Sequence, residues 1–335
     1  MVVFGQQVSD PERPPGLVPS GWPGVHTTTL RDLPADLPAR PRRLDHHLLL
    51  LVTAGHGGQT VDFVAHPCRP GTLVWARPGQ VIRYGRQPGL DAILVGWRAE
   101  LLAALEVGAP TLTDPFGPTH WQLTGEDEDA IINEVSQLVV DCDRYRSGGL
   151  PAELLRHQLA VLMLRIAALP TGPAAHAAHA EPEHAEHPEH AAYAAHIEPE
   201  AEPVPAHQSN GGGEHRPADT FLRFRRAVER SYVATRRVED YAARLGCSVR
   251  TLTRASLAAT GRSAKQVIDD RAALEARRLL ACTELPIAEI GQRLGFPEPT
   301  NFGRFFHREV GCSPGAFRAR ALRPDPPVPL PRQPR

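Results

Sequence analysis

The sequence predicts a two-domain protein, in which an antiparallel β-barrel with two helices is followed by an all-α domain. Three observations support this fold class. Short apolar runs separated by Gly- and Pro-containing breaks fill the first third of the chain, a segment rich in Ala, His, Glu and Pro lies in the middle, and helical periodicity returns after it. At 335 residues the chain is long enough for two domains with separate cores.

Five short runs within residues 25–98 have the length and alternation of β-strands. They are LLLLVTAG (48–55), QTVDFVA (59–65), GTLVWARP (71–78), QVIRYG (80–85) and DAILVGW (91–97). Several short strands at this spacing are typical of a small antiparallel barrel or sandwich. Residues 1–24 are rich in Pro and Gly, and we expect them to be a loose segment.

Two helices are expected to complete this first domain, which we place at residues 25–170. The first spans 124–146, with Thr124 as its N-cap and acidic residues in its first turn. The second spans 151–168 and begins at Pro151. Its apolar stripe is wider than a narrow seam, so it must be covered by the barrel, by the other helix or by another subunit.

The middle of the chain, residues 171–217, is predicted to be a disordered linker because it lacks the large apolar residues that would offset the entropy of ordering. Residues 323–335 are Pro-rich and are expected to form an extended tail. Charge is divided between these regions. Residues 171–216 carry eight Glu against one Arg, whereas residues 217–323 carry 20 Lys and Arg against 11 Asp and Glu. A basic C-terminal block favours a polyanion as its partner.

This basic block, residues 218–322, is predicted to contain two similar helix-turn-helix units. In the first unit, Ala242 allows close helix approach, Gly246 permits the tight turn, and Leu252 packs the second helix onto the first. Ser248 supplies an N-cap for that second helix. The motif therefore has a physical reason at each position.

The second unit repeats the spacing with Gly291 and Gly295, and Phe302 packs one residue later than Leu252 does. A continuous helix is predicted over residues 264–283, between the two units. A rigid helix in this place can present both second helices on one side. That arrangement suits neighbouring major-groove segments of DNA, about one helical turn (~34 Å) apart.

Cysteine usage and the apolar runs favour a cytoplasmic protein without a membrane partner. The five cysteines are scattered and lack CxxC spacing, which argues against a disulfide framework or a zinc site. The first residues do not resemble a signal peptide. No apolar run approaches the length of a membrane span.

The second unit also carries a specific signature, Gly-Phe-x-acidic-x-Ser/Thr-x-Phe, then Phe, then Gly-x-Ser-Pro-x-x-aromatic-Arg. The matching residues are Gly295, Phe296, Glu298, Thr300, Phe302, Phe306, Gly311, Ser313, Pro314, Phe317 and Arg318. The connecting helix contributes Arg271, Ala276, Leu279 and Leu280. Through these residues, 218–320 resembles the two-motif DNA-binding domain of the AraC/XylS family of bacterial transcription regulators.

The resemblance implies that the exposed faces of both second helices read double-stranded promoter DNA. Carried over by position, the DNA-binding residues are Arg250, Thr253, Arg254, Thr300 and Arg304. Arginine can donate two hydrogen bonds to guanine O6 and N7, although a solvated face or a phosphate contact remains the alternative for each. Membership would also imply a homodimer and a small-molecule effector, with RNA polymerase as a further candidate partner.

Four positions depart from the family pattern. Ser256 and Leu257 stand where an aromatic and a basic residue are usual, so the first unit is expected to pack differently or to bind more weakly. Pro299 and Gly303 lie on the expected reading face of the second unit and have no side-chain donor. We expect base discrimination to depend mainly on the first unit.

The first domain resembles, less closely, the sugar-sensing type of cupin domain, through Arg69-Pro70-Gly71 and Arg77-Pro78-Gly79-Gln80. Enzymatic cupins bind a metal through paired histidines and a glutamate. His46 and His47 are adjacent and would face opposite sides of a strand, and Ile82 stands where a histidine is common. We therefore expect no enzyme, no catalytic residue, no metal site and no cofactor.

A small effector inside the barrel fits this resemblance better. The candidate lining residues are His46, Trp75, Tyr84 and Trp97, and core packing is the alternative for each. A second hypothesis is a metal-responsive regulator. Eight linker histidines could hold Ni²⁺ or Zn²⁺ loosely, namely His176, His179, His184, His187, His190, His196, His207 and His215. Ordering entropy opposes such a site, and a solvated tether is the simpler interpretation.

Overall fold

The computed structural model describes residues 24–33, 40–85, 87–103, 117–146, 148, 151–170 and 217–323. The chain divides into two compact units, one formed by residues up to 175 together with those from 274 onward, and the other by residues 176–273. The predicted loose segment, disordered linker and Pro-rich tail lie almost entirely outside the described residues.

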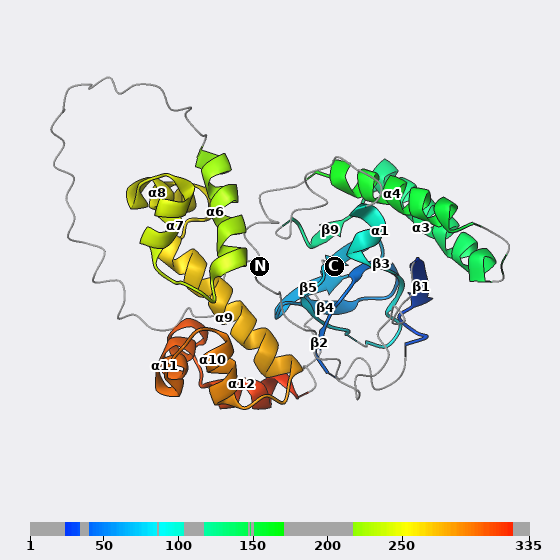
Figure 1. Ribbon diagram of the computed structural model, residues 1–335. Coiled ribbons are helices and arrows are strands. Elements are labelled where there is room, and N and C mark those ends of the chain that lie inside the picture. Colours follow the sequence, from blue (N-terminus) through cyan, green and yellow to red (C-terminus); the bar gives the residue numbers. More distant parts are fainter. Residues whose placement is uncertain are drawn as a thin grey trace, which may run out of the picture. The chain divides into compact units, whose positions relative to one another are not determined.

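The strands of the N-terminal region form two antiparallel sheets, as the sequence predicts (Figure 1). The first sheet has the order β1-β8-β3-β6-β9 and consists of β1 (Val25–Thr29), β8 (Asp91–Trp97), β3 (His47–Ala54), β6 (Thr72–Ala76) and β9 (His120–Gln122). The second has the order β2-β7-β4-β5 and consists of β2 (Arg42–Arg43), β7 (Val81–Arg83), β4 (Gly57–Val61) and β5 (Val64–Cys68).

Strand β3 is buried on both faces, which explains its unbroken leucine run. Leu49 and Leu51 belong to a core shared with two helices, whereas Leu48 and Leu50 belong to a core between the two sheets. Successive side chains of a strand point to opposite faces, so alternate leucines enter different cores. The first sheet is therefore the middle layer of this region.

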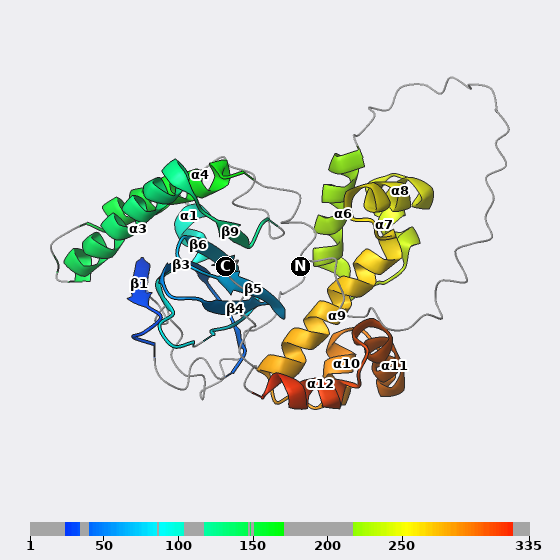
Figure 2. The same ribbon diagram turned by 180° about the vertical axis from the view of Figure 1, so that it is seen from behind.

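Helices α3 (Gly125–Arg146) and α4 (Ala152–Ala168) lie side by side and cover the outer face of the first sheet (Figures 1 and 2). Both helices fall where the sequence predicts helices. The apolar stripe of α4 packs inward through Leu155, Leu159, Leu162 and Ile166. Its other side remains exposed at Leu154, Val161 and Leu164. A short helix, α1 (Ala99–Ala103), follows β8.

The first helical group contains α6 (Pro217–Ser231), α7 (Val238–Leu245), α8 (Val249–Thr260) and the beginning of α9 (Ala264–Cys282). Phe224, Tyr241, Leu252 and Ile268 are fully buried in one cluster. The rings of Phe224 and Tyr241 meet edge to face, with centroids 5.6 Å apart. Side chains from all four helices thus share one core.

The second helical group contains α10 (Ile287–Arg293), α11 (Pro299–Val310) and α12 (Pro314–Ala321). Its centre is aromatic. The ring of Phe302 lies 5.4 Å from that of Phe296 and 5.9 Å from that of Phe306, and Phe306 meets Phe317 edge to face at 5.6 Å. These phenylalanines hold α11 and α12 together, so the motif residues that the sequence singled out are largely core residues.

Candidate nucleic-acid interface

The first helix-turn-helix unit is built as its motif predicts. Gly246 ends α7 in the left-handed conformation, with φ of 65°, and the N–H of Cys247 donates to the carbonyl oxygen of Ala242 at 3.0 Å. The hydroxyl oxygen of Ser248 accepts from the N–H of Thr251 at 3.0 Å and caps α8. Glycine tolerates the left-handed turn, and the cap satisfies a free donor, so these two residues fix where α8 begins.

The second unit has the same turn with different packing. Gly295 has φ of 78°, and the N–H of Phe296 donates to the carbonyl oxygen of Gly291 at 2.9 Å. A Cβ on Gly291 would lie 3.0 Å from the Cβ of Phe302, so α10 and α11 approach too closely for a side chain there. Pro299 occupies the first turn of α11, where its missing N–H costs no hydrogen bond.

The predicted reading residues lie on the outer faces of α8 and α11. Arg250, Arg254, Thr300 and Arg304 are exposed, and Thr253 is half-buried. Within the described residues, the three guanidinium groups make no hydrogen bond or ion pair. The opposite faces are buried through Leu252 and Ala255 on α8, and through Phe302, Phe305 and Phe306 on α11. Each second helix therefore offers unpaired arginine to a partner.

The departures from the family pattern have structural counterparts. Ser256 is fully buried on the inner face of α8, and its hydroxyl donates to the carbonyl oxygen of Leu252 in the same helix at 2.9 Å. Leu257 is 48% exposed where the family usually has a basic residue. No atom lies within 4 Å of a Cβ built on Gly303, so this part of α11 leaves open space.

Two residues near the reading faces are neutralised within the chain. The Arg262 guanidinium donates to the Asp270 carboxylate at 2.9 Å, and the Lys265 ammonium donates to Asp269 at 2.5 Å. The sequence reasoning missed a further set on α6, where Arg223, Arg226 and Arg230 are all exposed. Their i, i+3, i+7 spacing was the available signal.

Comparisons with known proteins match both parts of the chain. Residues 241–320 match a family described as a helix-turn-helix domain, and residues 33–138 match the AraC-like ligand binding domain. Both matches agree with the resemblance of the chain to the AraC/XylS family. It is 31% identical over 110 residues to the transcriptional activator NphR of a Rhodococcus species, covering 32% of each chain. It is 39% identical over 51 residues to the arabinose operon regulatory protein of Escherichia coli K12, covering 15% of this chain and 18% of that protein.

The alignments thus span about a third or less of these relatives' lengths. Among solved structures, ToxT of Vibrio cholerae O395 matches over 89% of this chain and 98% of that chain, with 9% identity and a TM-score of 0.41. The DNA-binding domain of AdpA in complex with a target DNA matches over 30% of this chain and 90% of that chain, with 32% identity and a TM-score of 0.28.

The AraC-like ligand binding domain contains the four residues predicted to line an effector site. Trp75 and Trp97 belong to the core covered by α3 and α4, not to the core between the sheets. Trp75 pairs with Leu49 and Trp97 with His47, so both tryptophans lie on the face of the sheet that Leu49 occupies. Tyr84 belongs to the core between the sheets, and burial raises the pKa of its phenol. His46 is 2% exposed, with Nδ1 2.8 Å from the Asp45 carboxylate. These positions favour core packing for the tryptophans.

His47, the neighbour of His46, joins the tryptophans. The Trp75 indole N–H donates to His47 Nδ1 at 3.2 Å, and the His47 ring stacks on Trp97 with centroids 5.1 Å apart. The Arg77 guanidinium lies 4.1 Å from the centre of the Trp75 ring. Burial, with the charge of Arg77, lowers the pKa of His47 to about 4, so its imidazole is neutral at physiological pH.

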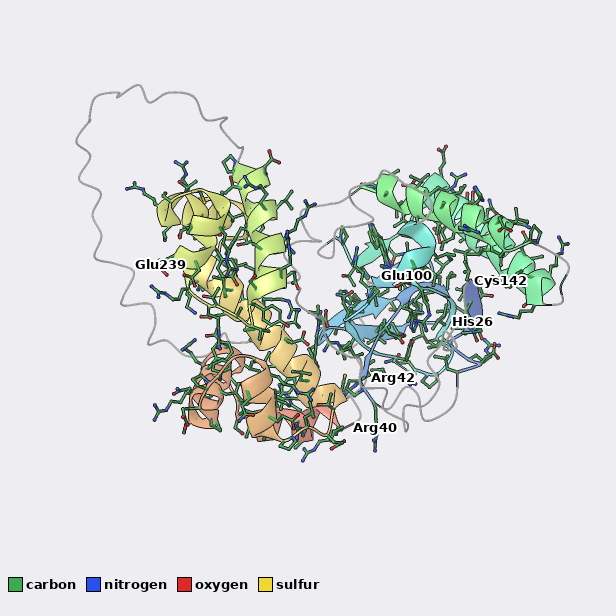
Figure 3. The ribbon with its side chains drawn as sticks, viewed as in Figure 1. His26, Arg40, Arg42, Glu100, Cys142 and Glu239 are labelled. Carbon is green, nitrogen blue, oxygen red and sulfur yellow. The ribbon has the colours of Figure 1, made fainter. Side chains whose placement is uncertain are left out.

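A second histidine lies where β1 meets α3. Figure 3 labels His26 on β1 beside Cys142 on α3, whose thiol donates to the carbonyl oxygen of Val25 at 3.7 Å. Burial, and then the charge of Arg146, lowers the pKa of His26. Among the described residues, no group of three or more His, Cys, Asp or Glu could hold a metal ion. No described helix is long and apolar enough to cross a membrane.

Proposed function

We propose that the protein is a sequence-specific transcription regulator that binds promoter DNA through α8 and α11 and responds to a small effector in its N-terminal domain. The observation that carries the proposal is the exposure of Arg250, Arg254 and Arg304 on the second helices of two capped helix-turn-helix units, with no partner among the described residues. The two family matches support the same assignment.

The geometry of α8 suits direct reading of bases. Arg250 and Arg254 are one turn apart on the same face, so their Cα atoms are separated by about 6 Å along the helix. This distance is close to two base-pair steps of about 3.4 Å. Each guanidinium can donate a forked pair of hydrogen bonds to a guanine in the major groove. The two arginines would therefore reach bases about two steps apart.

The second unit would act mainly in positioning. Arg304 is the one arginine among its predicted reading residues, and Gly303 and Pro299 have no side-chain donor. Contacts to phosphates fix the register of a protein on DNA without reading its sequence. We infer that α11 reads fewer base pairs than α8 and that the connecting helix α9 sets the spacing between the two contacts.

The N-terminal domain would supply effector binding and dimerisation. Tyr84 and His46 are the predicted lining residues that the structure leaves compatible with a site near the inter-sheet core. The exposed side of α4, with Leu154, Val161 and Leu164 38–47% exposed, is the apolar surface that a second copy would cover. RNA polymerase is a further candidate partner that no residue here identifies.

Footprinting on DNA beside the protein's own gene tests the proposal, followed by fluorescence anisotropy with the protected duplex. Arg250→Ala and Arg254→Ala should each weaken binding about 5- to 150-fold, equivalent to roughly 1–3 kcal/mol per forked contact. Arg31→Ala is the matched control, because Arg31 is an exposed arginine of the N-terminal domain that pairs with Asp91. Uniform weak binding to all duplexes, or equal effects of Arg250→Ala and Arg31→Ala, would contradict base reading.

A further inference from the structure

The outer face of α8 changes character along the length of the helix. Its first two turns carry Arg250 and Arg254, whereas residues 255–260 contain no charged side chain. Within this uncharged stretch, residues 257–259 are all exposed. Leu257 is 48% exposed and is the largest side chain of the three. The reading helix therefore ends in an apolar surface.

Leu257 lies on the same stripe of α8 as the reading arginines. An α-helix turns by about 100° per residue, so Leu257, seven residues after Arg250, returns to within about 20° of the direction of Arg250. Residues three and four apart on a helix are neighbours, with Cβ atoms about 5–6 Å apart, which places Leu257 beside Arg254 and Thr253. Helical side chains lean toward the N-terminus, so Leu257 leans toward the turn that carries Arg254.

The leucine cannot be covered by the core of its own unit. A single exposed leucine is ordinary on a protein surface and by itself indicates no partner. Here, however, the opposite face of α8 is already buried through Leu252 and Ala255, and Leu257 stands in line with two exposed arginines. Whatever molecule binds Arg250 and Arg254 therefore also meets Leu257.

The chemistry of the major groove limits what a leucine can recognise there. Base edges present hydrogen-bond donors and acceptors in this groove, together with one apolar group, the C5 methyl of thymine. A leucine side chain has neither donor nor acceptor, and burying a polar base edge against it without a hydrogen bond costs free energy. The thymine methyl is thus the group that complements Leu257.

We propose that Leu257 is a specificity-determining residue that reads the C5 methyl of one thymine in the DNA site. The proposal rests on the proposed DNA binding and adds a base to it. Leu257 lies about 4.5 Å beyond Arg254 along the helix axis, which is close to one base-pair step of about 3.4 Å. The half-site under α8 would then contain the guanines of Arg250 and Arg254, followed by a thymine about one step further on.

This role gives the departure of Leu257 from the family pattern a physical meaning. A basic residue at this position can contact a phosphate, which strengthens binding but carries no sequence information. Leucine gives up that contact and gains discrimination between thymine and cytosine, which lacks the methyl group. The exchange fits a chain in which the first unit supplies most of the base reading.

Replacement of single thymines by deoxyuridine in the footprinted duplex tests the proposal, because deoxyuridine lacks only the methyl group. Fluorescence anisotropy on the full chain should find one position under α8 where uracil weakens binding about fourfold, which equals about 0.8 kcal/mol for one methyl-sized group. Leu257→Ala should bind the thymine duplex more weakly than the wild-type chain does and should no longer respond to uracil at this position. The two changes should therefore not be additive.

Two further variants separate base reading from general effects on affinity. Leu222→Ala is the matched control, because Leu222 is a 38% exposed leucine of the same unit that lies on α6; it should keep the wild-type affinity and the response to uracil. Leu257→Lys should lose the response to uracil but bind unrelated duplexes more tightly at low salt. One added phosphate contact should also steepen its plot of log affinity against log salt by about 0.9.

The outcomes distinguish this proposal from the proposed function. A response to uracil that persists in Leu257→Ala would assign the methyl contact to another residue, such as Thr253, and would overturn the proposal. A wild-type chain that selects the footprinted duplex but responds to uracil at no position would also overturn it, and the proposed function would stand. A wild-type chain without preference for any duplex would refute the proposed function, and the reading of thymine with it.

Discussion

Two leucines of α8 offer a matched test of how the first reading unit is held. Leu252 is fully buried in the core with Phe224 and Tyr241, whereas Leu257 on the same helix is 48% exposed. Truncation of a buried leucine to alanine costs about 2–5 kcal/mol, and truncation of an exposed one changes stability by roughly 0.5 kcal/mol or less. Leu252→Ala should therefore destabilise this unit strongly, and Leu257→Ala should not.

Urea unfolding followed by circular dichroism at the helical minimum measures the difference. With a slope of about 1–3 kcal/mol per molar urea, Leu252→Ala should shift a helical transition to lower urea by on the order of 1 M. DNA affinity should fall with it, because a loosened core no longer holds Arg250 and Arg254 on one face. Equal midpoints for the two variants would refute the assignment of Leu252 to the core, and an affinity loss in Leu257→Ala without one in Leu252→Ala would refute the link between this core and the reading face.

Three further outcomes are expected. Ser248→Ala removes the hydroxyl that caps α8 and should lower the free energy of unfolding by about 1 kcal/mol in the same assay. An unchanged midpoint would show that this cap does not stabilise the helix. Gly291→Ala should lower the free energy of unfolding by about 1–3 kcal/mol, because the added Cβ meets Phe302. Gly303→Ala, whose added Cβ meets no atom, should leave stability unchanged or raise it, and a reversed order of the two variants would contradict the close approach of α10 and α11. The folded state lowers the pKa of His47 from 6.5 to about 4, so protonation favours the unfolded chain. The contribution of His47 to stability should therefore be full above pH 6.5 and fall by up to about 3 kcal/mol toward pH 4. His47→Gln should flatten this dependence of stability on pH.

The local features of the helical domain could be predicted because their causes are local. Gly246, Ser248 and Leu252 act within one helix and the turn before it, so spacing alone identified the turn, the cap and the core position. The antiparallel sheets were also predictable, since short alternating runs and glycine breaks are written into consecutive residues. The exposure of Arg250, Arg254 and Arg304 followed from the same helical period.

The features that could not be predicted depend on contacts between residues that are distant in sequence. Whether Trp75 faces the inter-sheet core or the helices depends on strand register and on which layer covers each face of the sheet. The run in β3 is apolar on both faces, so the alternation of polar and apolar residues could not indicate which face is which. The Asp62–Arg278 pair joins residues 216 positions apart. No local pattern marks either residue, and the positive φ of Asp62 and Phe63 in the turn between β4 and β5 cannot be inferred from a sequence that lacks glycine there.

The two reading units differ in what fills them. The first is packed by side chains from four helices around Leu252 and Tyr241, and the second by a cluster of phenylalanines around Phe302. A substitution in one set of side chains leaves the other intact, since the two sets share no member. In the proposed DNA complex, each half of the contact could thus change its base preference or its strength by mutation while its counterpart keeps the chain on the site. Operator sequences could then diverge one half at a time.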